Sequence, residues 1–144
     1  MAAIRFTKWE GNNGIREFII NQTGCLPFSG AGINPRPQQR TTILKSVDNT
    51  YYYDDNLDDI NNVEYTLFGH NGDQSINEVR FNAPLPLLNE NITHHIYLYR
   101  VRIFGGIKEY LWYGEYQITG METRPHIGKD RQNRNIIVLS LSRI

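Results

Sequence analysis

The chain has 144 residues, 15 basic and 15 acidic side chains, and 40% apolar residues, values that fit one globular domain. Zero net charge argues against a protein that coats nucleic acid non-specifically, because that mode neutralises many phosphates, but it leaves room for a local basic face. No apolar run is long enough for a membrane span or a secretory signal, and Cys25 has no second cysteine, so we expect a cytoplasmic protein without a membrane partner.

The first half of the chain carries one helix signal and two strand signals. In residues 11–22 apolar side chains recur at helical spacing, which predicts a helix inside an N-terminal extension of residues 1–27. Residues 41–47 and 63–69 have the β-branched and aromatic content typical of strands. A helical turn or two is expected within residues 74–89, where two prolines then break the pattern.

Strand signals dominate the second half. Residues 94–104, 109–121 and 135–144 are rich in β-branched and aromatic residues and alternate in part with period two. The segments between them, 105–108 and the basic 122–134, have the composition of hairpin loops. In the middle strand the alternation predicts one face with Tyr110, Trp112, Tyr116 and Ile118, and the other with Tyr113, Glu115 and Gln117.

These elements predict a single domain of mainly β, α+β architecture. Residues 28–144 would form the core, and the many strands favour a barrel-like sheet with one or two short helices. No repeat, low-complexity tract or interdomain linker interrupts the chain.

Catalytic machinery is not recognisable in the sequence. His94 and His95 are adjacent, so on a strand they point to opposite faces and cannot jointly hold one metal. The pair His70-Asn71 lacks the second histidine of an HNH nuclease, and Cys25 lacks the context of a nucleophile. No phosphate-binding glycine loop is present either. We therefore expect a reader without a cofactor or metal rather than an enzyme.

Residues 51–66, YYYDDNLDDINNVEYT, gather tyrosines and carboxylates within a short stretch. A base flipped out of a duplex is stacked on aromatic faces and hydrogen-bonded along its Watson–Crick edge, where cytosine offers an amino donor. Tyrosines, a carboxylate and backbone amides meet that need. Tyrosines at strand ends beside an acidic turn are also typical of an ordinary core edge and a solvated loop, so the stretch alone fits both interpretations.

Several short motifs, taken in order, resemble the SRA (SET and RING associated) domain, a reader of methylated or hydroxymethylated cytosine in DNA. They are Ala31-Gly32-Ile33, the strand end at Tyr53 with its acidic cluster, Tyr65-Thr66, Gly72-Asp73-Gln74 with Asn82-Ala83, IYLYRVR, Trp112-Tyr113-Gly114 and IIVLSLSRI. The interval from Tyr53 to Tyr65, 65 − 53 = 12 residues, agrees with that between the family's stacking tyrosines. Two positions depart from the family pattern: Asn56 replaces an aspartate, and Leu67 replaces the glycine after Tyr-Thr.

The resemblance implies a twisted PUA/SRA-like barrel with a pocket for 5-methyl- or 5-hydroxymethylcytosine. Tyr53 and Tyr65 would sandwich the extruded base, and Asp54 or Asp55 would accept a hydrogen bond from its amino group. The main chain near Thr66 and Gly32 would complete the hydrogen bonding along the base edge. The implied pocket residues are Gly32, Tyr53, Asp54, Asp55, Tyr65 and Thr66.

Phosphate and groove contacts are expected from loops around the implied pocket, because phosphate contacts fix the orientation of a protein on its duplex. Each candidate also fits the ordinary alternative of an exposed, solubilising side chain. The candidates are Arg36, Arg40, His70, Asn71, Arg80, Arg124, Lys129 and Arg131.

The leading hypothesis is a DNA reader that is not itself an enzyme. The compact motif spacing is most similar to SRA-like domains ahead of HNH nuclease domains in bacterial modification-dependent restriction endonucleases. That resemblance implies double-stranded DNA with a modified base as the partner, a covalently linked C-terminal nuclease domain, and a DNA-associated place in the bacterial cytoplasm. Two alternatives stay open: a reader of RNA or another modified base on a related barrel, and a β-rich protein or glycan interaction module, which the neutral charge mildly favours.

Overall fold

The computed structural model describes residues 3–27, 32–47, 59–67, 73–74, 89–128 and 130–144. In this part of the chain the elements are β1 (Ile4–Phe6), α1 (Ile15–Thr23), β2 (Ile33–Arg36), the 3-10 turn η1 (Pro37–Gln39), β3 (Thr41–Val47), β4 (Asn62–Thr66), β5 (His95–Phe104), β6 (Ile107–Ile127) and β7 (Asn133–Arg143). The predicted mainly β, α+β class is confirmed. Most of the turn expected within residues 74–89 lies outside the described residues.

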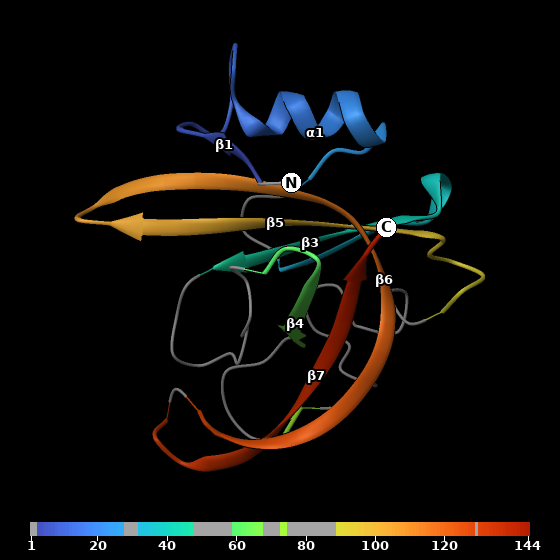
Figure 1. The fold of residues 1–144 in the computed structure, drawn as a ribbon, viewed down its shortest axis with the longest axis vertical. Coiled ribbons are helices and arrows are strands. Elements are labelled where there is room, and N and C mark those ends of the chain that lie inside the picture. Colours follow the sequence, from blue (N-terminus) through green and yellow to red (C-terminus); the bar gives the residue numbers. More distant parts are fainter. Residues whose placement is uncertain (1–2, 28–31, 48–58, 68–72, 75–88, 129) are drawn as a thin grey trace.

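The strands form one seven-stranded mixed sheet. Its path is β2-β3-β5-β6-β7-β4, and β1 pairs with β6 beside that path. The β3–β5 pair is parallel and the other pairs are antiparallel. In Figure 1, β6 is one long curved ribbon that lies beside β5 and then bends away to run with β7. Over the described residues the predicted barrel is therefore a strongly curved sheet that does not close, with β2 and β4 at the two ends of its path.

The loop predicted over residues 122–134 is mostly strand. β6 continues to Ile127 and β7 begins at Asn133, and the ladder between them runs unbroken from Met121 to its last pair at Ile127 and Asn133. Charged and proline residues made this segment look like a loop. The partner strand supplies backbone hydrogen bonds whatever side chains face solvent, so the hairpin extends despite its composition.

A glycine bulge changes the two faces predicted for β6. Gly114 has φ of 101°, a backbone conformation that glycine adopts without a steric penalty. At this point the β5–β6 register shifts, leaving Tyr113 as the extra residue. Before the bulge, Tyr110 and Trp112 face α1, whereas Tyr116 after it faces the opposite side of the sheet. The single face predicted from strict alternation is therefore wrong.

The core consists of two clusters, one on each side of the sheet. The inner cluster lies on the face away from α1 and contains Ile33, Leu44, Val63, Tyr65, Leu67, Ile96, Leu98, Tyr113, Tyr116, Leu139 and Leu141. The helix cluster lies between the sheet and α1 and contains Ile15, Ile19, Cys25, Ile43, Tyr99, Val101 and Trp112. Ile43 and Leu44 are neighbours on β3 but belong to different clusters, as the strand alternation requires.

Aromatic rings attach the N-terminal segment to the sheet. α1 overlaps the predicted range 11–22 and runs one residue beyond it, ending where Gly24, at φ of 70°, donates its N–H to the Ile20 carbonyl. The ring centroid of Phe18 on this helix lies 5.7 Å from that of Trp112 and 5.0 Å from that of Phe6. Figure 1 places β1 and α1 together on one side of β5 and β6. No helix in the described part of the chain has the length and apolar character to cross a membrane.

Candidate functional site

Tyr65 on β4 reaches the opposite end of the sheet. Its hydroxyl lies 3.0 Å from the carbonyl oxygen of Gly32, just before β2, and 3.0 Å from the carbonyl oxygen of Lys45 on β3. One hydroxyl has one proton, so the two carbonyls share it. Because β4 and β2 stand at the two ends of the strand path, the phenol joins elements that no described backbone ladder pairs. We call the hydroxyl and the two carbonyls the Tyr65 latch.

A side chain at Gly32 would crowd the latch. A Cβ there would lie 3.2 Å from the Tyr65 hydroxyl and 3.7 Å from the Lys45 carbonyl oxygen. The Gly32 carbonyl also accepts the Lys45 N–H at 2.7 Å. This close backbone approach explains a glycine at this position.

Tyr65 and Thr66 are buried. Tyr65 has 4% relative exposure. Its ring belongs to the inner cluster, which also contains Ile33 of β2 and Leu44 of β3. Thr66 is 3% exposed and pairs with Val138 on β7. The structure thus brings two predicted pocket positions, Tyr65 and Gly32, together, and Thr66 follows Tyr65 on β4. The hydroxyl of this phenol is fixed by the latch, and its ring is covered by the inner cluster.

The motif Asp73-Gln74 extends the β4–β7 ladder with side chains. The Gln74 side-chain amide donates to the Leu67 carbonyl at 2.5 Å and accepts the Ile137 N–H at 2.9 Å. The Gln74 N–H donates to the Asn135 carbonyl at 2.9 Å, and Asp73 accepts the Asn135 N–H at 2.7 Å. The sequence singled out this motif without indicating these contacts, which fix the chain just beyond Tyr65-Thr66.

Several predicted site residues lie outside the described residues. They are the pocket candidates Tyr53, Asp54 and Asp55 and the contact candidates His70, Asn71, Arg80 and Lys129. The described half of the implied clamp is therefore Tyr65 with the latch.

Two of the predicted DNA-contact arginines lie near η1. Arg36 is half-buried, and its guanidinium donates to the carbonyls of Leu26 (2.9 Å from Nε) and Pro35 (2.8 Å). Arg40 is exposed, and its guanidinium lies 3.5 Å from the His94 ring. Arg36 thus holds the segment before β2, while Arg40 extends into solvent.

Two further arginines lie on the β6–β7 hairpin. Arg124 pairs with Glu64 across the sheet and with Glu122 on its own strand. The hydrogen bond that the Arg124 guanidinium donates to Glu64, the largest cause, and the one that it donates to Glu122 raise the pKa of Arg124. Arg131 is exposed at the hairpin tip, at φ of 65°, and its N–H donates to the Gly128 carbonyl at 3.0 Å. The charge of Arg124 is compensated locally, whereas Arg131 projects from the tip.

Sequence reasoning missed two arginines on the inner face. Arg100 and Arg102 alternate with the helix-side residues of β5, so they continue the side that carries Ile96 and Leu98. Arg100 lies 3.3 Å from the Tyr113 hydroxyl, and Arg102 pairs with Glu109 at 3.9 Å. The Arg-Val-Arg alternation at the end of a predicted strand was the available signal.

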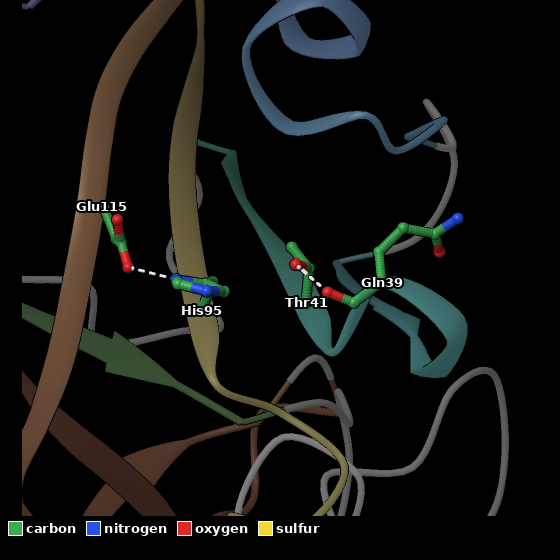
Figure 2. Close-up of polar contacts among 4 residues, drawn as sticks. All are labelled: Gln39, Thr41, His95 and Glu115. Atoms are coloured by element: carbon green, nitrogen blue, oxygen red, sulfur yellow. Dashed lines mark hydrogen bonds and ion pairs between the residues drawn. The ribbon is translucent and has the colours of Figure 1, made fainter.

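The adjacent histidines have different partners. His95 on β5 turns toward Glu115 on β6, with Nδ1 2.8 Å from the carboxylate, while Thr41 on β3 donates to the Gln39 carbonyl at 2.9 Å (Figure 2). His94 instead lies beside Arg40. Among the residues that the structure describes, no cluster of His, Cys, Asp and Glu could hold a metal ion.

Comparison with known proteins gives matches in structure alone. No protein-family model matches the chain, and no curated protein matches its sequence. The MspJI restriction endonuclease in complex with a 27-mer oligonucleotide superposes with a TM-score of 0.68 at 13% identity, over 99% of this chain and 42% of that one. The SUVH5 SRA domain in complex with fully methylated CG DNA gives a TM-score of 0.59 at 19% identity, over 99% and 88% of the two chains.

A third structure, the sulfur-binding and SRA domains of ScoMcrA complexed with phosphorothioated DNA, gives a TM-score of 0.59 at 17% identity over 100% of this chain. The chain has an SRA-like fold. The resemblance predicted from the order of short motifs is thereby confirmed for the fold. The SRA-like chain spans 40% and 28% of two ScoMcrA chains but 88% of the isolated SUVH5 SRA domain. It corresponds to one part of the longer proteins.

Proposed function

We propose that this SRA-like chain recognises a modified cytosine, carrying a 5-methyl or 5-hydroxymethyl group, in double-stranded DNA. The base would be flipped out of the duplex and stacked against Tyr65. The observation that carries the proposal is the hydrogen bond between Tyr65 and Gly32, two pocket candidates that lie 33 positions apart in the sequence. The structural neighbours add support, since the SUVH5 SRA domain has been solved with methylated CG and methylated CHH DNA.

The remaining pocket groups follow from the family pattern. Tyr53 would supply the second stacking ring, and Asp54 or Asp55 would accept from the cytosine amino group. Stacking on an aromatic ring contributes about 1–3 kcal/mol per base, and unstacking costs a few kcal/mol. Binding therefore also needs phosphate contacts, for which the exposed Arg40 and Arg131 are the described candidates.

Base stacking on Tyr65 requires movement. With 4% relative exposure, the ring can present a face to a base only after the groups that cover it shift. We propose that DNA binding includes this opening, in line with the loop rearrangements of other regulatory complexes.

The broader proposal is a specificity domain. The chain would direct a restriction nuclease, of HNH type, that lies outside these residues, and it would itself catalyse nothing. Support comes from two structural neighbours, the MspJI restriction endonuclease and the restriction endonuclease ScoMcrA. A DNA-associated protein of the bacterial cytoplasm, serving defence against foreign DNA, fits that role.

A competition experiment tests the reader function. Matched duplexes with unmodified, hemimethylated, fully methylated and hydroxymethylated cytosine compete for the chain, and fluorescence anisotropy gives each Kd. A fluorescent base analogue beside the target reports extrusion. We expect tighter binding of a modified duplex together with increased fluorescence. Equal Kd values for all duplexes contradict the proposal, and preference for RNA or methyladenine DNA would favour a related reader instead.

A further inference from the structure

We infer that Arg40 and Arg131 anchor the phosphate backbone of the bound duplex, and that each does so from a backbone position where an arginine lowers the stability of the fold. The inference rests on the proposed function and deepens it, because it singles out two positioning residues and states what their presence costs. Neither residue belongs to the implied base pocket, and both lie in the described part of the chain.

The first observation is the backbone conformation of the two arginines. Among the described residues other than glycine, three have positive φ: Asn13 at 65°, Arg40 at 50° and Arg131 at 65°. The left-handed region brings the Cβ of an L residue too close to the following carbonyl oxygen, and glycine and asparagine adopt it most readily. Asn13 therefore suits its position, whereas each arginine destabilises the turn that contains it.

Backbone hydrogen bonds impose this conformation, and none of them uses an arginine side chain. At the hairpin tip, the Arg131 N–H donates to the Gly128 carbonyl at 3.0 Å, and the Gly128 N–H donates to the Gln132 carbonyl at 2.9 Å. A tight turn followed by one left-handed residue is a common hairpin connection, and that residue is usually glycine. At the end of η1, the Arg40 N–H donates to the Pro37 carbonyl at 3.1 Å. Glycine or asparagine would complete both turns with less strain.

The second observation is that neither side chain supports the fold. Both are exposed. Within the part of the chain that the structure describes, the Arg131 side chain makes no hydrogen bond or ion pair, and the Arg40 guanidinium has one long contact, 3.5 Å to the His94 ring. Arg36 and Arg124 differ, because they lie in strands and their guanidiniums bind a backbone carbonyl and a carboxylate. A role for arginine at positions 40 and 131 therefore lies in contacts outside the chain.

The third observation concerns the partner that two such groups fit. An exposed guanidinium presents several N–H donors in a planar fork that matches phosphate oxygens. In Figure 1, η1 and the tip of the β6–β7 hairpin lie on opposite sides of the molecule. A small anion would occupy one arginine, whereas a duplex is an extended polyanion that can reach both. Two separate phosphate contacts would fix its orientation on the protein.

The experiment replaces each arginine with asparagine, which tolerates the left-handed backbone and removes the charge. We expect Arg40→Asn and Arg131→Asn each to raise Tm by a few degrees, because the strained residue is gone. Each should also raise the Kd of modified and unmodified duplexes alike, by about threefold to tenfold, and lower the salt dependence by about one unit of log Kd against log salt. Thermal denaturation and anisotropy titrations at several salt concentrations measure these effects.

Asn13→Arg is the reciprocal control. Asn13 is exposed, has the same φ as Arg131 and lies just before α1, on the helix side of the sheet. An arginine placed there meets the same strain away from the inner face, so we expect a lower Tm and wild-type Kd values.

Three results would overturn the inference. They are an asparagine variant at either position that fails to raise Tm, an asparagine variant that keeps the wild-type Kd and salt dependence, and an unchanged Tm in Asn13→Arg. Failure of the proposed function has a different signature. Wild type would then show no preference for modified over unmodified duplexes, while the two asparagine variants would still bind both more weakly.

Discussion

The two sides of the sheet are held together by different chemistry. On the helix side, Phe18 of α1 packs on Trp112 and Trp9, between β1 and α1, packs on Tyr99, and the contacts are apolar and spread over many atoms. On the inner side, apolar packing ends at the latch, where a single hydroxyl holds carbonyls from two other segments. When packing is spread over many atoms, a substitution costs stability in proportion to the contacts it removes. When one hydroxyl bonds two carbonyls, removing that hydroxyl breaks the whole connection. We therefore expect changes on the helix side to alter stability alone, and changes at Tyr65 to alter both stability and the proposed selectivity.

The largest expected effect comes from removing a buried tyrosine on each side. Tyr65→Ala leaves a cavity in the inner cluster and deletes the proposed stacking ring, so we expect about 3–5 kcal/mol of lost stability together with loss of discrimination for modified DNA. Tyr99→Ala is the matched control, because Tyr99 is 0% exposed in the helix cluster. Urea denaturation gives the stability of both variants, and anisotropy below their transitions gives the Kd ratio. The comparison breaks if Tyr99→Ala abolishes discrimination while Tyr65→Ala retains it.

A smaller effect is expected just beyond β4, where the side chains of Asp73 and Gln74 make hydrogen bonds to the backbone in place of a paired strand. Gln74→Glu removes the amide donor to the Leu67 carbonyl and keeps an acceptor for the Ile137 N–H. A buried acceptor left without its donor costs about 1–3 kcal/mol. Hydrogen exchange followed by NMR should show faster exchange at the Leu67 and Ile137 amides than in wild type. Unchanged exchange at both amides would mean that Gln74 does not fix this end of the strand.

Local and non-local information explain what the sequence predicted. The helix at Ile15–Thr23 and strands such as Thr41–Val47 carry their own periodicity, so short-range reasoning located them. The bulge at Gly114 was missed because a glycine inside a strand looks the same whether or not it bulges, and the register against β5 decides. The latch depends on the curvature of the whole sheet, which brings Tyr65 to Gly32 across a path of six strands. Only the family resemblance paired those two residues in advance.

Charge reversal gives the smallest effect and separates positioning from reading. Arg131→Glu at the exposed hairpin tip should weaken binding of all duplexes by a similar factor and lower the salt dependence by about one unit of log Kd against log salt. Arg124→Gln should change DNA affinity less, because Glu64 and Glu122 already compensate that guanidinium. Titrations at several salt concentrations, with modified and unmodified duplexes, measure both slopes. A selective loss for the modified duplex in Arg131→Glu would place base reading at the hairpin, and the division between an inner selective side and peripheral phosphate contacts would have to be redrawn.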